Sequence, residues 1–383
     1  MSIQYNTLEV RVRLAAIRAN YRLLASRGGK VVGVIKADAY GHGLSEVAEA
    51  LLQEGCDTLA VGTVGEAATL RAHLSAQGPG SKGQDARILS LLGPLSPDDY
   101  PMLWAHRVIP FVGSFRQLEE LARHAAKLMK PLSVSLKFDT GMARLGFTVE
   151  ELPRLIERLR EAPLIRPVMA SSHLATADEP DSMEFVKAQG ERFTLILNGL
   201  AAAGHKLEAN IANSAGILGH PNLHHQSQRA GIALYGANPF GGTTWEHLGQ
   251  ALAPAMEVRT RIAAVHALPK GRSISYGATF TAPRDMTVAI VAAGYADGYS
   301  RGLTGRGAQM LIAGRRAPLV GRVCMQLTAV DVTDIPDART GEWAVLLGGE
   351  GPLAIRPEEL AGWWGTITYE VFCMLGLNRR VYI

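Results

Sequence analysis

The stretch VVGVIKADAYGHGLSEVAEALLQEGCDTLAVGT, residues 31–63, contains one complete unit of the fold. It begins with an apolar run at 31–37, continues with an amphipathic helical pattern at 44–53, and ends with a second apolar run at 58–63. Parallel strands cannot be joined by a tight turn, so a strand, a helix and a strand in this order predict two parallel strands with a crossover helix.

The same alternation continues to about residue 240. Six further apolar runs lie at 86–93, 107–113, 132–140, 166–175, 207–214 and 230–236. Helical patterns separate several of these runs, at 64–74, 114–128 and 182–204. Eight strand–helix units in one array predict a TIM (β/α)8 barrel, whose chemistry lies at the carboxyl ends of its strands. An open doubly wound sheet is the alternative.

The sequence pattern changes after about residue 245, where strand-like segments alternate with turn sequences such as PKGRS and GRGA. These segments are 255–268, 286–296, 308–314, 318–325, 328–332 and 342–349, with helices expected only around 356–363 and 369–377. We expect an α/β protein with a barrel at 1–245 and a mostly antiparallel β domain at 246–383, divided within 237–249. The N-terminus predicts a short strand and then an amphipathic helix, and residues 1–8 are expected to pair with the β domain.

The composition excludes several classes of protein. The chain has 383 residues with a formal net charge of +4, which is thinly spread, and no block of Lys and Arg is interleaved with aromatics. We therefore expect no nucleic-acid partner. No apolar stretch approaches 18 residues, and the N-terminus has no signal-peptide pattern, so neither a membrane partner nor secretion is expected. Three widely spaced cysteines predict neither a disulfide framework nor a metal site, and favour the reducing cytoplasm.

Lys36 ends the first strand-like run and is followed by ADAYGHG. A lysine at the end of an apolar strand can lie in a desolvated site, which lowers its pKa and suits a Schiff base with a carbonyl cofactor. A surface lysine at a strand end is the other interpretation.

VIKADAYGHG (34–43) resembles the cofactor-lysine motif of the alanine racemases. The resemblance extends over nearly the whole chain, through LKFDTGMARLGF (136–147), SSHLATADE (171–179), NSAG (213–216), RAGIALYG (229–236), SYGATF (275–280), GYADGYSRG (294–302), GRVCM (321–325) and ITYE (367–370). It implies a barrel followed by a β domain, a pyridoxal 5'-phosphate cofactor, and interconversion of L-alanine and D-alanine. Such an isomerase would supply D-alanine as a peptidoglycan precursor, or would break it down.

The resemblance also implies how the proton is moved. Racemisation needs a proton removed from one face of the α-carbon and delivered to the other. The simplest arrangement therefore places one proton-transfer group on each face. The matches are Lys36 on one face and Tyr276 on the other. Family members form head-to-tail homodimers, which would make the second group Tyr276 of the partner subunit. Taken alone, Tyr276 could be an ordinary core tyrosine.

The matched motifs imply a set of cofactor contacts. Arg229 would face the pyridine nitrogen, and because a guanidinium keeps its proton, that nitrogen would stay unprotonated and the ring would be a weaker electron sink. His173 would pack on the ring and bond toward Arg229 and Tyr276. Without the resemblance, Arg229 would be interpreted as a member of a surface ion pair and His173 as an ordinary core histidine. The phosphate would be bound by Tyr40, Ser214, Gly231, Ile232 and Tyr369.

The substrate carboxylate would be bound by Arg144 and by the backbone N–H of Met325. Lys137 matches a lysine that is often carbamylated in this family, and an unmodified lysine beside Arg144 would be repulsive unless an anion intervenes. Tyr295 and Arg301 match residues that narrow the substrate entryway, although each could be an ordinary surface residue. Gln326 departs from the family pattern, in which Asp is usual.

Three alternatives remain. The first is a racemase of broader range that also accepts serine. The second is a basic amino-acid decarboxylase on the same architecture, although those enzymes place an acid where this chain has Arg229. The third is a non-catalytic cofactor-binding protein of the single-barrel type, which would end before Tyr276 and Tyr369.

Overall fold

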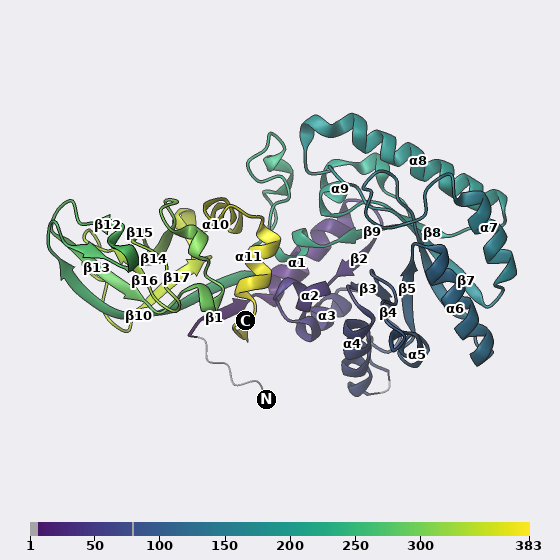
Figure 1. Cartoon of the computed structure of the whole chain (residues 1–383), viewed down its shortest axis with the longest axis horizontal. Coiled ribbons are helices and arrows are strands. Elements are labelled where there is room, and N and C mark those ends of the chain that lie inside the picture. The colour runs from purple at the N-terminus through teal and green to yellow at the C-terminus, as the bar shows by residue number, and fades with distance from the viewer. Residues whose placement is uncertain (1–6, 79) are drawn as a thin grey trace. The chain divides into compact units, whose positions relative to one another are not determined.

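A computed structural model describes residues 7–78 and 80–383 of the chain. Its contacts divide it into two compact units. One contains Ile17–Ala39 and Leu44–Ala253, and the other contains residues 7–16, Tyr40–Gly43 and Pro254–Ile383. We call them the barrel unit and the β unit, and Figure 1 shows the elements of each.

The barrel unit is built on eight parallel strands, as the sequence predicts. In chain order they are β2 (Lys30–Val34), β3 (Thr58–Val61), β4 (Arg87–Ser90), β5 (Val108–Val112), β6 (Leu132–Lys137), β7 (Ile165–Ser171), β8 (Glu208–Asn210) and β9 (Ser227–Ala230). They lie side by side in the order β8-β7-β6-β5-β4-β3-β2-β9. The N–H of Arg229 in β9 donates to the carbonyl of Ala212, just beyond β8, and this bond joins the two outer strands.

Helices surround these strands (Figure 1). They are α1 (Leu14–Ser26), α3 (Leu44–Gln53), α4 (Val64–Ala76), α5 (Asp99–Ala105), α6 (Phe115–Leu128), α7 (Leu152–Glu161), α8 (Met183–Ala202) and α9 (Ser214–Gly219). Their sequences explain where they begin. Thr63 and Glu66 form a reciprocal capping box at α4, and the Ser114 hydroxyl caps α6.

The eighth strand expected at 230–236 is wrong. Strand β9 is Ser227–Ala230, and the apolar residues Ile232–Tyr235 form a buried 3₁₀ turn instead. All four side chains of β9 are buried even though the segment reads SQRA. Polar side chains that face a functional barrel interior carry no hydrophobic signal, so the apolar turn beside them is mistaken for the strand.

The segment that carries Lys36 is a left-handed turn, α2 (Lys36–Tyr40). Four consecutive residues, Ala37 to Tyr40, have φ angles of 52–54°. L-amino acids avoid this region because Cβ approaches the carbonyl oxygen, at a cost of about 1–2 kcal/mol per residue. A run of this kind persists only where the surroundings hold it, and such strain concentrates at functional sites.

The β unit is mostly antiparallel, as expected. Its strands are β1 (Glu9–Val12), β10 (Met256–Leu268), β11 (Ser273–Ile274), β12 (Phe280–Thr281), β13 (Met286–Val291), β14 (Gln309–Ile312), β15 (Arg315–Val320), β16 (Thr328–Asp331), β17 (Trp343–Leu347) and β18 (Arg379–Tyr382), and its helices are α10 (Pro357–Trp364) and α11 (Thr368–Leu375). Strand β10 pairs with both β17 and β13, so six strands close into a ring.

The N-terminal strand belongs to this sheet. Strand β1 pairs antiparallel with β10 and parallel with β18. Residues 1–6 of the expected pairing lie outside the described residues.

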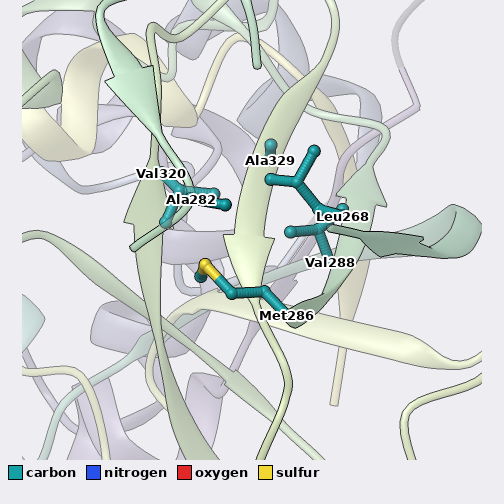
Figure 2. Close-up of a cluster of buried hydrophobic side chains, with 6 residues drawn as sticks. All are labelled: Leu268, Ala282, Met286, Val288, Val320 and Ala329. Atoms are coloured by element: carbon teal, nitrogen blue, oxygen red, sulfur yellow. The ribbon is translucent and has the colours of Figure 1, made fainter. Parts of the chain in front are cut away.

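A cluster of buried side chains lies in the β unit (Figure 2), and the partly buried Ile274 and Phe280 of the β11–β12 hairpin pack against it. It consists of Leu268, Ala282, Met286, Val288, Val320 and Ala329. Full burial of one large apolar side chain contributes about 1.5–3 kcal/mol, so this cluster stabilises the unit. In the described part of the chain, no helix is long and apolar enough to cross a membrane.

Candidate active site

Residues from five strands converge at the carboxyl end of the barrel, because parallel strands all end on the same side. Lys36 follows β2, Lys137 ends β6, His173 follows β7, Ser214 follows β8 and Arg229 lies in β9. Lys36 is exposed in the single chain, and so is Arg144 in the loop after β6. The other four are buried or half-buried.

Arg229 is the most strongly held of these residues. It is 4% exposed, and its Nη1 donates to the backbone oxygen of Asn210 at 3.2 Å and to that residue's Oδ1. Its Nη2 donates to the carbonyl of Ser172 and to His173 Nδ1, the latter at 3.0 Å. Burial, with the charge of Arg144, lowers the pKa of Arg229 to about 10, so it keeps its proton at neutral pH. The one guanidinium donor with no acceptor in the described chain is Nε–H.

The Arg229 contact fixes the protonation of His173. A guanidinium can only donate, so Nδ1 must accept and the ring proton lies on Nε2. Burial, then the charges of Arg229 and Lys137, hold the pKa of His173 well below its ordinary value. His173 is therefore a neutral imidazole at neutral pH, with a donor on the nitrogen that faces away from Arg229.

Lys137 is a lysine that is unusually easy to deprotonate. Burial first, then the positive charges of Arg229 and Arg144, lower its pKa to about 7, and Asp139 opposes the shift. Its Nζ donates to the carbonyl of Phe138 at 2.7 Å. Three cationic side chains therefore face one region with one carboxylate to balance them, which is the repulsion that the sequence predicts for Lys137 beside Arg144.

The loop that carries Arg144 is shaped by Asp139. Its Oδ1 accepts from the backbone N–H groups of Gly141 and Ala143, at 2.8 and 3.1 Å. Ala143 adopts a φ of 53°, which these bonds stabilise. The loop therefore presents the Arg144 side chain to solvent from a defined backbone.

Ser214 lies in a cradle of backbone donors. Its buried Oγ accepts from the N–H of Gly231 at 3.0 Å and from that of Ala233 at 3.2 Å. A hydroxyl has two lone pairs and one proton, so these two bonds leave the Ser214 O–H available to donate. The side-chain Nδ2 of Asn210, also buried, has no partner among the described residues. Donors without acceptors at this end of the barrel fit a ligand that presents acceptors, such as a phosphate.

The β unit contains the other predicted residues. The rings of Tyr40 and Tyr369 lie 5.8 Å apart. Tyr40 is buried, and burial together with Tyr369 raises its pKa, so its hydroxyl is a proton donor at neutral pH. Tyr369 is exposed at the start of α11. The Tyr40 hydroxyl is therefore a neutral group beside the ring of Tyr369.

Tyr276 projects from a turn between the short strands β11 and β12. The side chain is 68% exposed, which rules out the core tyrosine considered from the sequence. The turn is anchored because the Ser275 hydroxyl donates to the carbonyl of Arg322 at 2.7 Å and lies 3.5 Å from Cys324 Sγ. These contacts bring the turn of Tyr276 beside the loop that carries Met325, which is 58% exposed.

The loop of Met325 packs against the turn that begins at Tyr295. The N–H of Tyr295 donates to the carbonyl of Cys324, and that of Ala296 donates to the carbonyl of Met325. A side chain at Gly294 would come within 2.2 Å of the Cys324 oxygen, so only glycine fits there. Tyr295 and Arg301 line one cavity of about 420 Å³, together with Gly298, Ser300, Trp364 and Met374.

Gln326 lies exposed beside this packed pair of loops. The neighbouring carboxylate is Asp297, which is buried and accepts from the N–H of Gly294 at 3.0 Å. Burial raises the pKa of Asp297, while Gly294 and the Gln326 side chain act in the opposite direction. An aspartate at position 326 would add a second negative charge here, and the neutral glutamine avoids it.

Sequence reasoning missed two residues of the barrel end. Asn210 binds Arg229, but a single asparagine in LEANIANS carries no distinctive signal. Glu66 contacts the turn of Lys36, with Oε1 2.7 Å from the Ala37 nitrogen. The T-x-x-E pattern of Thr63 and Glu66 is visible in the sequence as a capping box, but that pattern does not show the contact with Ala37.

Comparisons with known proteins agree with this architecture. The family described as alanine racemase, N-terminal domain, matches residues 12–239, and alanine racemase, C-terminal domain, matches 255–382. An alanine racemase of Nitratidesulfovibrio vulgaris (strain Miyazaki F) is 53% identical over 382 residues, which is 100% of both chains. One from Pseudomonas taetrolens is 38% identical, over 97% of this chain and 98% of the relative.

Solved structures give the same result. The alanine racemase of Streptomyces coelicolor A3(2) superposes with a TM-score of 0.90 at 32% identity, covering 98% of each chain. That of Bartonella henselae, described with covalently bound pyridoxal phosphate, superposes with a TM-score of 0.86 at 28% identity, covering 98% of this chain and 99% of the other. Fold and site thus define an isomerase built from a parallel barrel and a β domain. The chain belongs to the alanine racemase family, and its activity is the racemisation of alanine.

Proposed function

We propose that this chain is a pyridoxal 5'-phosphate enzyme that interconverts L-alanine and D-alanine by two-base proton transfer, with Lys36 on one face and Tyr276 of the partner subunit on the other. The observation that carries the proposal is the buried Arg229–His173 pair. Four guanidinium contacts are made within the protein. The remaining Nε–H is a donor that cannot be lost as a proton, which suits an unprotonated pyridine nitrogen.

The other end of the cofactor suits the hydroxyl and backbone donors. We assign the phosphate to the Ser214 hydroxyl, to the backbone at Gly231 and Ile232, and to the hydroxyls of Tyr40 and Tyr369. The Ser214 geometry supports this assignment, because its oxygen already accepts two N–H bonds and its proton is left to donate. Neutral hydroxyls and amides bind a phosphate without requiring a counter-charge, as at other late barrel strands.

The cofactor, when bound, makes the α C–H of the amino acid acidic by withdrawing electrons from it. The chain's own residues do the rest. The Lys36 amine, attached at the carboxyl end of β2, takes or returns the proton on one face. The Tyr276 phenol does so on the opposite face. Arg229 keeps the ring a weak electron sink, and this favours prompt reprotonation of the α-carbon.

A phenol ordinarily keeps its proton at neutral pH, so the proposed role of Tyr276 requires a neighbouring group that stabilises its oxygen once the proton has left. We propose that the Nε2–H of His173, the nitrogen that Arg229 leaves protonated, donates to the phenol oxygen of Tyr276 and so stabilises that oxygen after its proton has left. The buried, neutral state of His173 supports this role. Arg229, His173 and Tyr276 would then form one chain of hydrogen bonds in the assembled site.

We propose assembly as a head-to-tail homodimer, and the exposure of Tyr276 supports it. A catalytic phenol open to solvent would exchange its proton with water, so we propose that a second copy covers it. The same unit exposes other large apolar side chains, among them Met325, Ile367 and Leu377. Monomeric proteins rarely leave such groups uncovered in number, and a partner that buries them explains their presence.

The substrate carboxylate is assigned to Arg144 and to the backbone N–H of Met325. We propose that Lys137 is carbamylated, which replaces a cation by an anion and holds Arg144 in place. Its pKa of about 7 supports this, because only the neutral amine reacts with CO2. Tyr295 and Arg301 form the entryway, and a narrow passage between them favours a side chain as small as that of alanine.

Four broader assignments complete the proposal. We place the enzyme in the cytoplasm, where it would supply D-alanine as a peptidoglycan precursor. None of the three cysteines forms a disulfide in the described chain, which suits a reducing compartment. We keep the domain division near residue 245. Gln326 is expected to affect the substrate range and the kinetic balance of the enzyme but not the proton-transfer pair.

The decisive experiment combines trapping with an assay. Borohydride reduction of the holoenzyme followed by peptide mapping should place the cofactor on Lys36, and a different lysine would overturn the assignment. Incubation of alanine, serine and basic amino acids in deuterium oxide should give racemised, α-deuterated alanine. Release of CO2 from a basic amino acid would instead identify a decarboxylase, and equal turnover of serine would identify a broad-range racemase.

A further inference from the structure

The left-handed turn that carries Lys36 needs an external support. Its own backbone contributes the bond from the N–H of Ala39 to the carbonyl of Ile35 at 2.9 Å. At the far side, the Asp38 Oδ1 accepts from the N–H of Leu44 at 2.7 Å. The peptide bond directly after Lys36 is supported from a different element, since the Ala37 N–H donates to Glu66 Oε1 at 2.7 Å.

Glu66 binds a second element at the same time. Its Oε2 accepts from the N–H of Gly62 at 2.8 Å and from that of Thr63 at 2.9 Å, where β3 passes into α4. A Cβ atom at Gly62 would lie 2.8 Å from this oxygen and 3.7 Å from Lys36 Cβ, so the three residues are packed together. The carboxylate therefore joins the end of β3 to the backbone of Lys36.

The barrel repeats this arrangement two strands later, with a different residue. After β5, the Gln117 Oε1 accepts from the N–H of Gly113 at 3.0 Å, in the same third position of the helix as Glu66. Its Nε2 donates to the carbonyl of Leu92, in the loop that follows β4. One end caps the helix and the other reaches the preceding strand–helix loop, as at Glu66.

The comparison shows what selects glutamate at position 66. The Gln117 side chain meets one donor and one acceptor, which an amide satisfies. All three groups that face Glu66 are N–H donors, so both of its side-chain oxygens must accept. A glutamine here would turn an N–H2 group toward either Ala37 or Gly62.

We propose that Glu66 is a positioning residue for Lys36, fixing the amine through the left-handed peptide bond that follows it. The inference rests on the proposed role of Lys36, but the contact with Ala37 can be measured independently of that role. Misplacement of a reacting group by about 1 Å can reduce a rate by about 10²-fold, so loss of this support should lower kcat more than it raises KM.

The test compares Glu66→Gln with the reciprocal control Gln117→Glu in the holoenzyme. Each variant exchanges an oxygen and an amide nitrogen in the side chain that caps a helix. In Gln117→Glu, a carboxylate oxygen replaces the Nε2 that donates to the Leu92 carbonyl. Amide hydrogen exchange at Ala37, followed by mass spectrometry with residue resolution, should be at least about tenfold faster in Glu66→Gln and unchanged in Gln117→Glu. The kcat should fall about 10–100-fold in the first variant and less than about threefold in the second.

A third variant keeps the test informative if Glu66→Gln folds poorly. Adding Ala37→Gly removes the Cβ that makes the left-handed turn unfavourable, and it should restore part of the lost kcat. The proposal is overturned if Ala37 exchange accelerates while kcat falls no more than in Gln117→Glu, or if Ala37 exchange does not respond. Borohydride mapping of the wild-type enzyme to another lysine would overturn the proposed function, and the exchange result would still report on the contact.

Discussion

The pKa of Lys137 leads to a quantitative prediction about CO2. At pH 7 an ordinary lysine with a pKa of 10.5 is neutral in about one molecule in 3,000, whereas a pKa of about 7 leaves about half neutral. The reactive fraction of Lys137 is therefore about 1,500 times that of an exposed lysine. In the reaction the neutral amine nitrogen bonds to the carbon of CO2 and releases one proton, which leaves a carbamate anion facing Arg229 and Arg144.

The assay is carbon-13 NMR of the enzyme in labelled bicarbonate at pH 7.5, where one carbamate signal is expected. It should disappear in Lys137→Met and persist in Lys187→Met, which removes an exposed surface lysine. Because only the neutral amine reacts, the rate of carbamate formation should fall as the pH is lowered through about 7. A signal that survives in Lys137→Met, or a rate whose midpoint lies above about pH 9, would refute the reasoning.

Three other variants test separate parts of the structure. Tyr276→Phe should reduce racemisation by about 10²–10⁴-fold with an unchanged Tm, because only the hydroxyl is removed and the ring is kept; circular dichroism of the alanine product and thermal melts measure both, and a loss of less than about tenfold would contradict the two-base scheme. Arg229→Lys should lower the free energy of unfolding by about 2–4 kcal/mol in urea, since several buried acceptors lose their donors; an unchanged unfolding midpoint would show that the network is not stabilising. Met286→Ala should lower it by about 2–5 kcal/mol by opening a cavity in the cluster of Figure 2, with kcat per folded molecule unchanged, and a comparable loss of kcat would mean that the cluster also positions the turn of Tyr276 through Ile274 and Phe280.

The sequence predicts the architecture well where burial is apolar. The first seven barrel strands and most of the β strands fall within or close to the apolar runs, since each presents side chains to a core. The sequence does not predict strand β9, because most of its buried residues are polar. The neighbouring Ile232–Tyr235 carry the hydrophobic signal instead. Strand β18 was missed because RRVY carries two arginines in only four residues.

The sequence likewise predicts some features of the candidate site and not others. Motif order predicts which residues matter, and the family comparison confirms the enzyme. The left-handed form of Ala37–Tyr40 could not be predicted, because KADAY has the composition of an ordinary helix start and the conformation depends on distant contacts. The hydrogen-bond partners of Arg229 and Glu66 belong to other strands or to the loops that follow them. No local pattern could therefore reveal that Arg229 faces only acceptors and that Glu66 faces only donors.

The surroundings of Arg229 also limit how this enzyme could diverge. The backbone and side-chain oxygens of Asn210, the Ser172 carbonyl and His173 Nδ1 all accept from the guanidinium. An acidic residue at position 229, which would strengthen the ring of the proposed cofactor as an electron sink, would leave these acceptors without donors at about 1–3 kcal/mol each. A change of reaction type would therefore require several substitutions at once, and evolution by single steps from this sequence is confined to chemistry in which position 229 stays a donor.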